Sequence, residues 1–496
     1  MAYTHLTEEQ VKKLVEQGCT AADWRQVTVS PCCDLTRING VHFYGTVQIG
    51  DTAGTHAVDG VELMCGIYGA SISDCEIGDG VRIANVGSVI SNYIIENDVI
   101  IQDVAALVAD PNASYGNGVE LETINEGGGR GVKIINDLTS QAAYVQGMLR
   151  HNAAFTKKLD ELVEAKAKGA KTEKGRVAIG ARILHCGTIR NVTIGVHAYV
   201  HGSQFLENGT INSCIEHPTE VGEGVQAKSF ILSEGARVES GAVLDKAFVG
   251  QGVKMGKQFS AENSLFFANC EAFHGEAVSL FGGPYTVTHH KSTLLIAGLF
   301  SFYNAGSGTN QSNHMYKLGP VHQGVLERGC KTGSFSYLLL EAHIGAFSVV
   351  IGKHYANLDL PNLPFSYISE EDGNSKIVPG MNLPAVGTVR DGEKWPKRDG
   401  RKAPKKRDLI IFDVFSPYTI EKMRRGRNEL LALSEKVPRE KTFVMYGGAQ
   451  LSRLLLKKGA KYYSLGITRY LQGKVLDRVR EALTKEKQWS AAIASL

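Results

Sequence analysis

The sequence lacks several features that would place it quickly in a class. Only 13 prolines occur among 496 residues, and none of the nine cysteines belongs to a C-x-x-C motif. The cysteine pattern therefore indicates neither a zinc ribbon nor a thioredoxin-type pair, and the odd count favours free thiols in a reducing compartment. No apolar run is long enough to span a bilayer, and the polar N-terminus does not have the form of a signal peptide. We expect a cytoplasmic protein.

An excess of charge of either sign is also missing. The 54 lysines and arginines nearly balance the 51 aspartates and glutamates, which leaves a net charge of +3. Nothing in this balance favours a nucleic-acid or membrane partner, and we expect neither. Glycine, by contrast, is abundant at 55 residues, and 43% of the chain is hydrophobic. This combination indicates a fold with many tight backbone corners rather than disorder.

A six-residue pattern recurs along the chain, with one aliphatic residue followed by small or turn-forming residues. Examples are "VESGAV" at 238–243 and "MGKQFS" at 255–260. The aliphatic positions Val221, Val238 and Met255 lie 17 residues apart, close to three hexads per turn. Such hexads are typical of a β-solenoid, in which each forms a short strand and a corner, and successive coils pair as parallel strands.

These hexads resemble the hexapeptide-repeat superfamily of left-handed parallel β-helices, and the left-handedness is implied by that resemblance alone. We expect a mainly β fold of this type, with an N-terminal helix, an inserted helical arm and a C-terminal helical domain. A capping box from Thr7 to Gln10 and a stop at Gly18 predict the first helix. Ser416 followed by Pro417 predicts the start of a later one.

The expected divisions of the chain follow from where the hexads stop. Apolar residues at helical spacing predict an insertion, and the 391–407 segment, with eight basic and three acidic residues, predicts a solvated linker. The predicted parts are an N-terminal helical cap at 1–38, a first β-helix block at 39–136, a helical insertion at 137–174, the main β-helix at 175–368, a basic linker at 369–412 and a C-terminal helical domain at 413–496.

One polar run interrupts the hexads and predicts a site. The run at 302–324, "FYNAGSGTNQSNHMYKLGPVHQG", is rich in glycine and side-chain amides and contains no Asp or Glu. The absence of carboxylates favours an anionic or carbonyl-bearing ligand over a metal. The run is similar to the N-x-G-x-G-T-x-x-x-N stretch near the active site of the acetyltransferase domain in bacterial amino-sugar uridylyltransferases. The matching positions are Asn304, Gly306, Gly308, Thr309 and Asn313.

The superfamily resemblance implies a function. Hexapeptide-repeat proteins are most often acyltransferases that modify sugars, amino sugars or small amines in a groove between the subunits of a trimer, with one histidine as general base. It therefore implies a homotrimer, a small-molecule substrate, an acyl-CoA or nucleotide-sugar co-substrate and no covalently bound cofactor. The candidate bases are His314, His289 and His290, and the candidate substrate-binding residues are Asn304, Asn310, Asn313, Lys317, Lys291, His274 and His322.

Other interpretations of these patterns stay open. The stretch "IGVHAYVHGSQF" at 194–205 is similar to the zinc-binding pattern of trimeric β-helix carbonic anhydrases, except that three residues rather than four separate its histidines. His185, His197 and His201 are therefore candidate zinc ligands. A solenoid with helical additions could also be a non-enzymatic scaffold or assembly protein. Segments such as "LPAVGTVRDGEKWPKRDGR" resemble a domain-of-unknown-function family of long bacterial β-helix proteins, which implies architecture but no activity.

Overall fold

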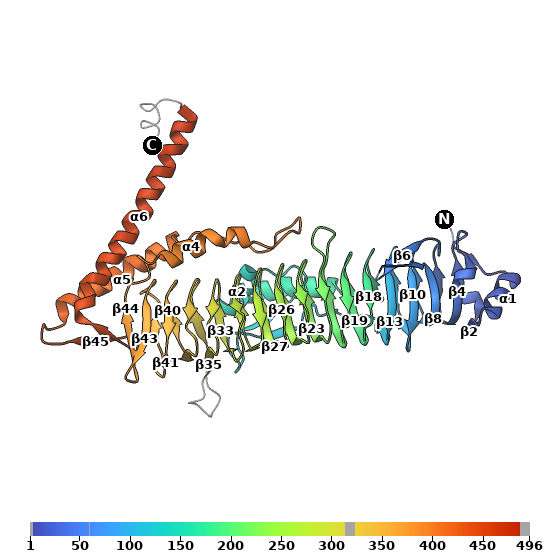
Figure 1. Ribbon diagram of the computed structural model, residues 1–496, viewed down its shortest axis with the longest axis horizontal. Helices are drawn as coiled ribbons and strands as arrows, with labels where there is room; N and C mark the ends of the chain where they lie inside the picture. The colour runs from blue at the N-terminus through green and yellow to red at the C-terminus, as the bar shows by residue number, and fades with distance from the viewer. Residues whose placement is uncertain (1–2, 59, 313–322, 487–496) are drawn as a thin grey trace. The chain divides into compact units, whose positions relative to one another are not determined.

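The computed structural model describes residues 3–58, 60–312 and 323–486. It shows a mainly β fold, a solenoid of short stacked strands with a few helices, which confirms the predicted solenoid (Figure 1). The chain divides into two compact units. One comprises Met1–Ser292 and Gly400–Leu409, and the other comprises Thr293–Asp399 and Ile410–Leu496.

Consecutive coils of the first unit pair in parallel register. The strand β22 (Glu220–Val221) pairs with β24 (Arg237–Val238), which pairs with β26 (Lys254–Gly256). One row of this register contains the three aliphatic positions predicted from the hexads, Val221, Val238 and Met255. All three side chains are buried. The 17-residue spacing is confirmed, because one turn of 17 residues returns the chain to the same wall of the solenoid.

In several coils of the first unit, a longer strand bends around a corner. The strands β21 (Phe205–Ile211) and β23 (Gln226–Leu232) stack in parallel, and β21 bends at Asn208, whose φ is 51°. Asparagine tolerates this left-handed conformation better than most residues with a side chain. Its amide also connects neighbouring segments, because Nδ2 donates to Ser229 Oγ at 3.3 Å and Oδ1 accepts from the Gly116 amide at 2.9 Å.

The N-terminal helix forms as predicted. α1 (Glu8–Glu16) begins with a reciprocal capping box between Thr7 and Gln10, and Gly18 follows it with a φ of 75°. Parallel strand pairing starts earlier than residue 39, because β3 (Val27–Val29) already pairs with β5 (Val47–Ile49). A strand of three residues is too short to show the hexad pattern in the sequence.

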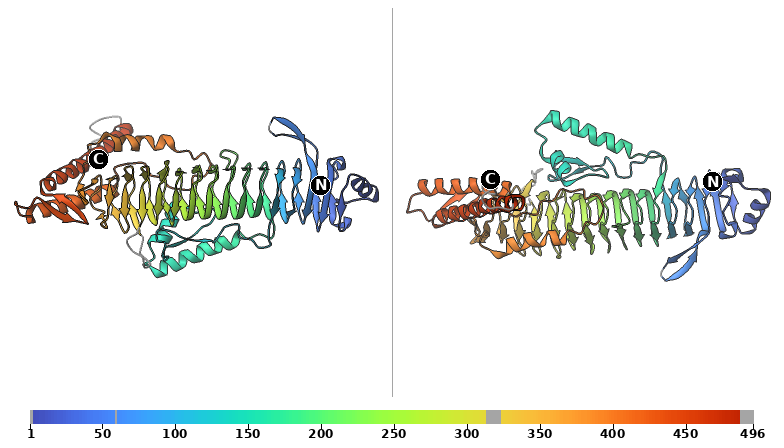
Figure 2. Two further views of the ribbon diagram at one scale, coloured as in Figure 1. Left: turned by 60° about the horizontal axis from the view of Figure 1, so that its bottom comes forward. Right: turned by 90° about the horizontal axis from the view of Figure 1, so that it is seen from above.

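An insertion separates two runs of coils in the first unit. The coils stop after β14 (Ala106–Val108) and resume at β17 (Gly175–Val177). The intervening segment lies beside the coils (Figure 2) and contains the hairpin β15 (Glu120–Glu122) and β16 (Gly131–Lys133), then α2 (Ser140–Met148) and α3 (Ala153–Gly169). Both helices fall within the predicted 137–174 insertion. The insertion begins earlier than predicted, because it also includes the hairpin. The sequence did not reveal this, since the hairpin strands have the same apolar spacing as a coil.

The segment predicted as a solvated linker has regular structure and packed side chains instead. It includes β44 (Asn374–Val378), which pairs antiparallel with β43 (Tyr367–Glu371), then α4 (Val386–Lys394) and a 3-10 helix at Pro396–Arg398. Residues 400–409 pack on the first unit, where the Arg407 Nε donates to Glu234 at 3.1 Å. The composition of the segment cannot show this packing, because Glu234, whose carboxylate neutralises Arg407, lies 173 residues away in the sequence.

The C-terminal part of the second unit is formed by two helices and a hairpin. α5 (Pro417–Lys436) begins with Ser416 as N-cap and Pro417 in its first turn, as predicted. β45 (Phe443–Tyr446) and β46 (Ala449–Ser452) follow, and α6 (Arg453–Glu486) then packs against α5. Among the described residues, none of the helices combines the length and apolar character needed to cross a membrane.

Candidate functional site

Four predicted site residues come together on the outer surface of the first unit. His274 directly follows β28 (Glu271–Phe273), whereas His289, His290 and Lys291 follow β31 (Val287–Thr288). These two strands pair in parallel, with Glu271 opposite Val287, so the residues after them lie side by side. His274 is half-buried, and the other three are exposed.

Two further side chains complete this group. β26 pairs with β28 so that Gly256 lies opposite Phe273, which places Lys257 beside His274. The Lys257 Nζ lies 5.0 Å from the centre of the Phe273 ring, and the His289 ring stacks on Phe273 with centroids 5.7 Å apart. The aromatic ring therefore orients both a cation and an imidazole. We call Lys257, His274, His289, His290 and Lys291 the cationic cluster.

The sequence did not predict three residues of this site, namely Lys257, Phe273 and Glu271. The repeat nevertheless contains a signal for Lys257. Lys257 precedes His274 by 17 residues, which is one coil, and His290 follows after nearly the same interval. Projecting candidate residues onto the coil period would have placed them in adjacent turns.

Glu271 supplies a carboxylate to the cluster. It contacts Nε2 of His289 and lies 3.9 Å from the Lys254 Nζ. A carboxylate on one ring nitrogen holds the imidazole in place and favours the tautomer with its proton on that nitrogen, so that Nδ1 is the acceptor. This is the geometry of a general base with an orienting partner.

The environment of His274 favours its neutral form. Partial burial lowers the pKa of the His274 imidazole, and the nearby charges of Lys257 and Lys291 lower it further. At neutral pH the side chain is therefore uncharged and can accept a hydrogen bond or a proton. His290 adjoins the group, with its ring edge-on to His289 at a centroid distance of 6.3 Å.

The described part of the polar run continues the coils, which corrects the prediction that the hexads break there. Asn304 lies on β34 (Asn304–Ala305) and Asn310 on β35 (Asn310–Ser312), both in the second unit. β35 pairs in parallel with β38 (Tyr337–Leu339). Gln311 of this strand has a structural role, because it is buried and donates to the Tyr303 hydroxyl at 3.1 Å.

The motif threonine has the same structural role. Thr309 is buried, and its Oγ1 donates to the Gly306 carbonyl at 2.7 Å and lies 2.8 Å from Thr332 Oγ1. These contacts satisfy polar groups inside the solenoid, where an unpaired hydroxyl would be costly. The other predicted residues of the run, His314, Asn313, Lys317 and His322, lie outside the described residues.

The three candidate zinc ligands do not form a cluster. His185 Nδ1 lies 3.0 Å from an Asp103 carboxylate oxygen, and the two ring nitrogens of His201 lie 3.3 and 3.2 Å from Glu220 and Glu223. His197 precedes the strand β20 (Tyr199–His201), which His201 ends. Across residues 3–58, 60–312 and 323–486, no three His, Cys, Asp or Glu side chains are arranged to hold a metal ion.

Comparison with known proteins extends these observations. A relative from Treponema pallidum (strain Nichols), described as an uncharacterized protein, is 25% identical over 491 residues. The alignment covers 94% of this chain and 66% of the relative, so the chain spans slightly less than two thirds of the relative's length. The family model for a domain of unknown function, DUF4954, matches residues 3–434. Because this match includes the whole cationic cluster and most of the chain, the chain belongs to the DUF4954 family.

Proposed function

We propose that this protein is an acyltransferase-type transferase that modifies a sugar, a sugar nucleotide or a small amine at the cationic cluster. The observation that carries the proposal is the contact between His289 and Glu271 beside Lys257 and Lys291. A carboxylate-bound histidine suits a general base, and lysines suit the phosphates of acyl-CoA or of a nucleotide sugar. Among the three candidate bases predicted from the sequence, His289 has this carboxylate partner, whereas His314 lies outside the described residues.

The proposed reaction needs only groups that the cluster and the substrates supply. Nδ1 of His289 accepts the proton of the acceptor hydroxyl or amine while the acceptor oxygen or nitrogen bonds to the acyl carbon. The carbon–sulfur bond of the thioester then breaks, and the leaving thiolate of CoA takes the proton from His289. Lys257 and Lys291 hold the donor phosphates during this exchange.

A neighbouring copy of the chain has a place in this proposal. The cluster lies on the outer wall of the coils, where His289, His290 and Lys291 are exposed. In the superfamily that the hexads resemble, such a wall forms one side of a groove between subunits. We therefore propose a homotrimer in which a second copy covers the cluster and excludes water from it.

A non-enzymatic scaffold is the second candidate function, and α6 is the observation that favours it. Several large apolar side chains of α6 are exposed, namely Leu454, Leu465, Leu471, Val475 and Leu476. Apolar side chains exposed along one helix are candidates for contact with a partner protein. A scaffold would not be stabilised by acyl-CoA or nucleotide sugars.

Ligand-dependent unfolding separates the two candidates. A ligand that binds only the folded protein stabilises it by about 2.7 kcal/mol at a hundredfold excess over Kd. We expect acetyl-CoA or a nucleotide sugar to raise the Tm of the full chain, and the double variant Lys257→Ala/Lys291→Ala to bind at least about tenfold more weakly. The control Lys457→Ala/Lys461→Ala removes two lysines of α6 and should bind like wild type. Unchanged Tm across a panel of acyl-CoA and nucleotide sugars would favour the scaffold.

A further inference from the structure

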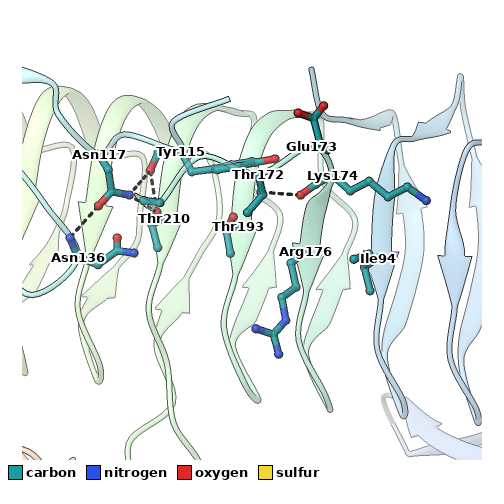
Figure 3. A pocket seen from close by; sticks show the side chains of 11 residues that line it. Ile94, Tyr115, Asn117, Asn136, Thr172, Glu173, Lys174, Arg176, Thr193 and Thr210 are labelled. Carbon is teal, nitrogen blue, oxygen red and sulfur yellow. Dashed lines mark hydrogen bonds between the residues drawn. The ribbon is translucent and has the colours of Figure 1, made fainter. Parts of the chain in front are cut away.

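A cavity lined by none of the cationic-cluster residues lies in the first unit, between the inserted segment and the wall of the coils (Figure 3). Its volume is about 490 Å³, within the range of small-molecule sites. Thr193 of β19 (Thr188–Ile194) and Thr210 of β21 contribute from the coils, whereas Tyr115, Asn117 and Asn136 contribute from the insertion. We call it the insertion pocket.

Hydrogen bonds fix one wall of the insertion pocket in place. Asn117 is buried, and its Oδ1 accepts from the backbone amide of Asn136 at 2.9 Å. Thr210 Oγ1 donates to the Tyr115 carbonyl at 2.6 Å, which ties the insertion to the coil. Because these contacts hold the wall without a ligand, a ligand would meet a preorganised surface.

Polar groups remain for a ligand. The Asn136 Oδ1 has no hydrogen-bond partner among the described residues, although it is buried at the pocket wall. Buried side-chain oxygens are rarely left without a partner. The Thr193 hydroxyl points into the same space, below the Tyr115 ring (Figure 3). Ile94 and Ala170 add an apolar surface to these polar groups.

Charge distinguishes the insertion pocket from the cationic cluster. Two cations lie at its rim, but each already has a carboxylate partner. Lys174 Nζ lies 2.8 Å from Glu76, and the Arg176 Nε donates to Glu96 at 2.6 Å. The Lys174 side chain extends away from Thr193 and Asn136 (Figure 3). An anionic ligand would therefore gain little from them, since their charges are neutralised locally.

We propose that the insertion pocket binds a neutral polyhydroxylated ligand of the size of a monosaccharide. Sugar hydroxyls would pair with the amide of Asn136 and the hydroxyl of Thr193, and the apolar face of the ring would lie on Ile94. Among the described residues, the only charged side chain of the lining without an ion-pair partner is the exposed Glu173, whose carboxylate would repel an anion, and the hydroxyl, amide and apolar groups match the surface of a neutral sugar. The inference does not depend on the proposed transfer reaction, because none of these residues belongs to the cationic cluster.

Calorimetric titration of the full chain with neutral monosaccharides, such as glucose, galactose and N-acetylglucosamine, tests the inference. We expect saturable binding of at least one of them. Asn136→Leu and Thr193→Val should each weaken that binding by about tenfold, because each removes a hydrogen-bonding group and keeps the side-chain volume. Thr193→Ser should restore it, and Thr55→Val, at an exposed threonine elsewhere in the unit, should leave it unchanged.

Three results would overturn the inference. These are the absence of saturable binding by any neutral sugar of the panel, tighter binding of the corresponding sugar phosphate, and equal affinity of wild type, Asn136→Leu and Thr193→Val. His289→Asn separates this site from the proposed catalytic one, since Asn136→Leu and Thr193→Val should still weaken sugar binding when His289 is already replaced. Circular dichroism of each variant shows whether a lost affinity reflects lost folding, and Thr193→Ser supplies a folded comparison for the coil position.

Discussion

At the scale of single residues, buried charge is the feature with the clearest energetic consequence. Glu327, in the second unit, has only 6% of its side chain exposed. Its Oε1 lies 2.9 Å from His343 Nε2 and 3.1 Å from Lys422 Nζ. Burial alone would raise the pKa of this carboxyl, but the His343 hydrogen bond and the Lys422 charge outweigh it and hold the pKa below its usual range.

Removal of the lysine partner should destabilise the second unit. Lys422→Met removes a positive charge beside the buried Glu327 carboxylate. Breaking a buried ion pair in this way lowers the free energy of unfolding by about 3 kcal/mol. Chemical unfolding measures this change. The control is Arg424→Met on the same helix, where the partner Glu421 is on the surface, and we expect little change from it. Equal effects of the two substitutions would contradict the role assigned to the buried pair.

The same carboxylate should make stability depend on pH. A depressed folded-state pKa stabilises the protein above the unfolded-state pKa, about 4.3 for glutamate, and the contribution is lost as pH falls through the folded-state value. We expect the stability difference between wild type and Glu327→Gln to be largest near neutral pH and to shrink in acid. Urea unfolding over a pH series measures it, and a difference that grows on acidification would be inconsistent with the lowered pKa.

Among the elements, the close stacking of coils leaves no room for added atoms at certain glycines. A Cβ on Gly209, in β21, would lie 2.3 Å from the Phe230 ring in the next coil. A Cβ on Gly169, at the end of α3, would meet nothing within 4 Å. The two positions therefore separate steric crowding from the general effect of replacing a glycine.

We expect Gly209→Ala to lower the Tm of the first unit, because the coils must shift to accommodate the methyl group. Gly169→Ala should leave stability unchanged or raise it by up to about 1 kcal/mol, since alanine is the better helix former. Scanning calorimetry of both variants makes the comparison. Similar Tm values for the two would show that the coils are less tightly packed than the structure indicates.

Sequence reasoning succeeded for the elements that carry a local signal. The row of Val221, Val238 and Met255 and the caps at Thr7 and Ser416 follow from spacing and residue type, and the structure shows each of them. The 400–409 segment could not be predicted, because its conformation depends on carboxylates such as Glu234 that only the fold brings near. The inward orientation of Thr309 could not be predicted for a related reason, since sequence does not show which side of a strand faces inward.

At the scale of the whole molecule, only some residues of the candidate site could be predicted from the sequence. His274, His289 and His290 were among the predicted site residues, and the coil period brings them together. Phe273 and Glu271 were missed because an aromatic residue and a glutamate carry no signal until their neighbours are known. The insertion pocket had no sequence signal, since its walls are joined only when the insertion folds back on the coils.

The proposed trimer makes a prediction about mass in solution. Light scattering coupled to gel filtration should give three times the 53.7 kDa of one chain. The expectation comes from the resemblance to the hexapeptide-repeat superfamily and from the exposed cluster, which a neighbouring wall would cover. A monomer at all accessible concentrations would remove the inter-subunit groove from the proposal, whereas the contact between His289 and Glu271 within one chain would stand.

The most direct test of the central claim is the rate of CoA release from acetyl-CoA in the presence of amino sugars and small amines. Wild type should release thiol in an acceptor-dependent reaction, and His289→Asn should lose at least about a hundredfold in rate, as expected for a general base. His151→Asn, at an exposed histidine of the insertion, should match wild type. Acceptor-dependent release that is equal in wild type and His289→Asn would contradict the assignment of this histidine as the base.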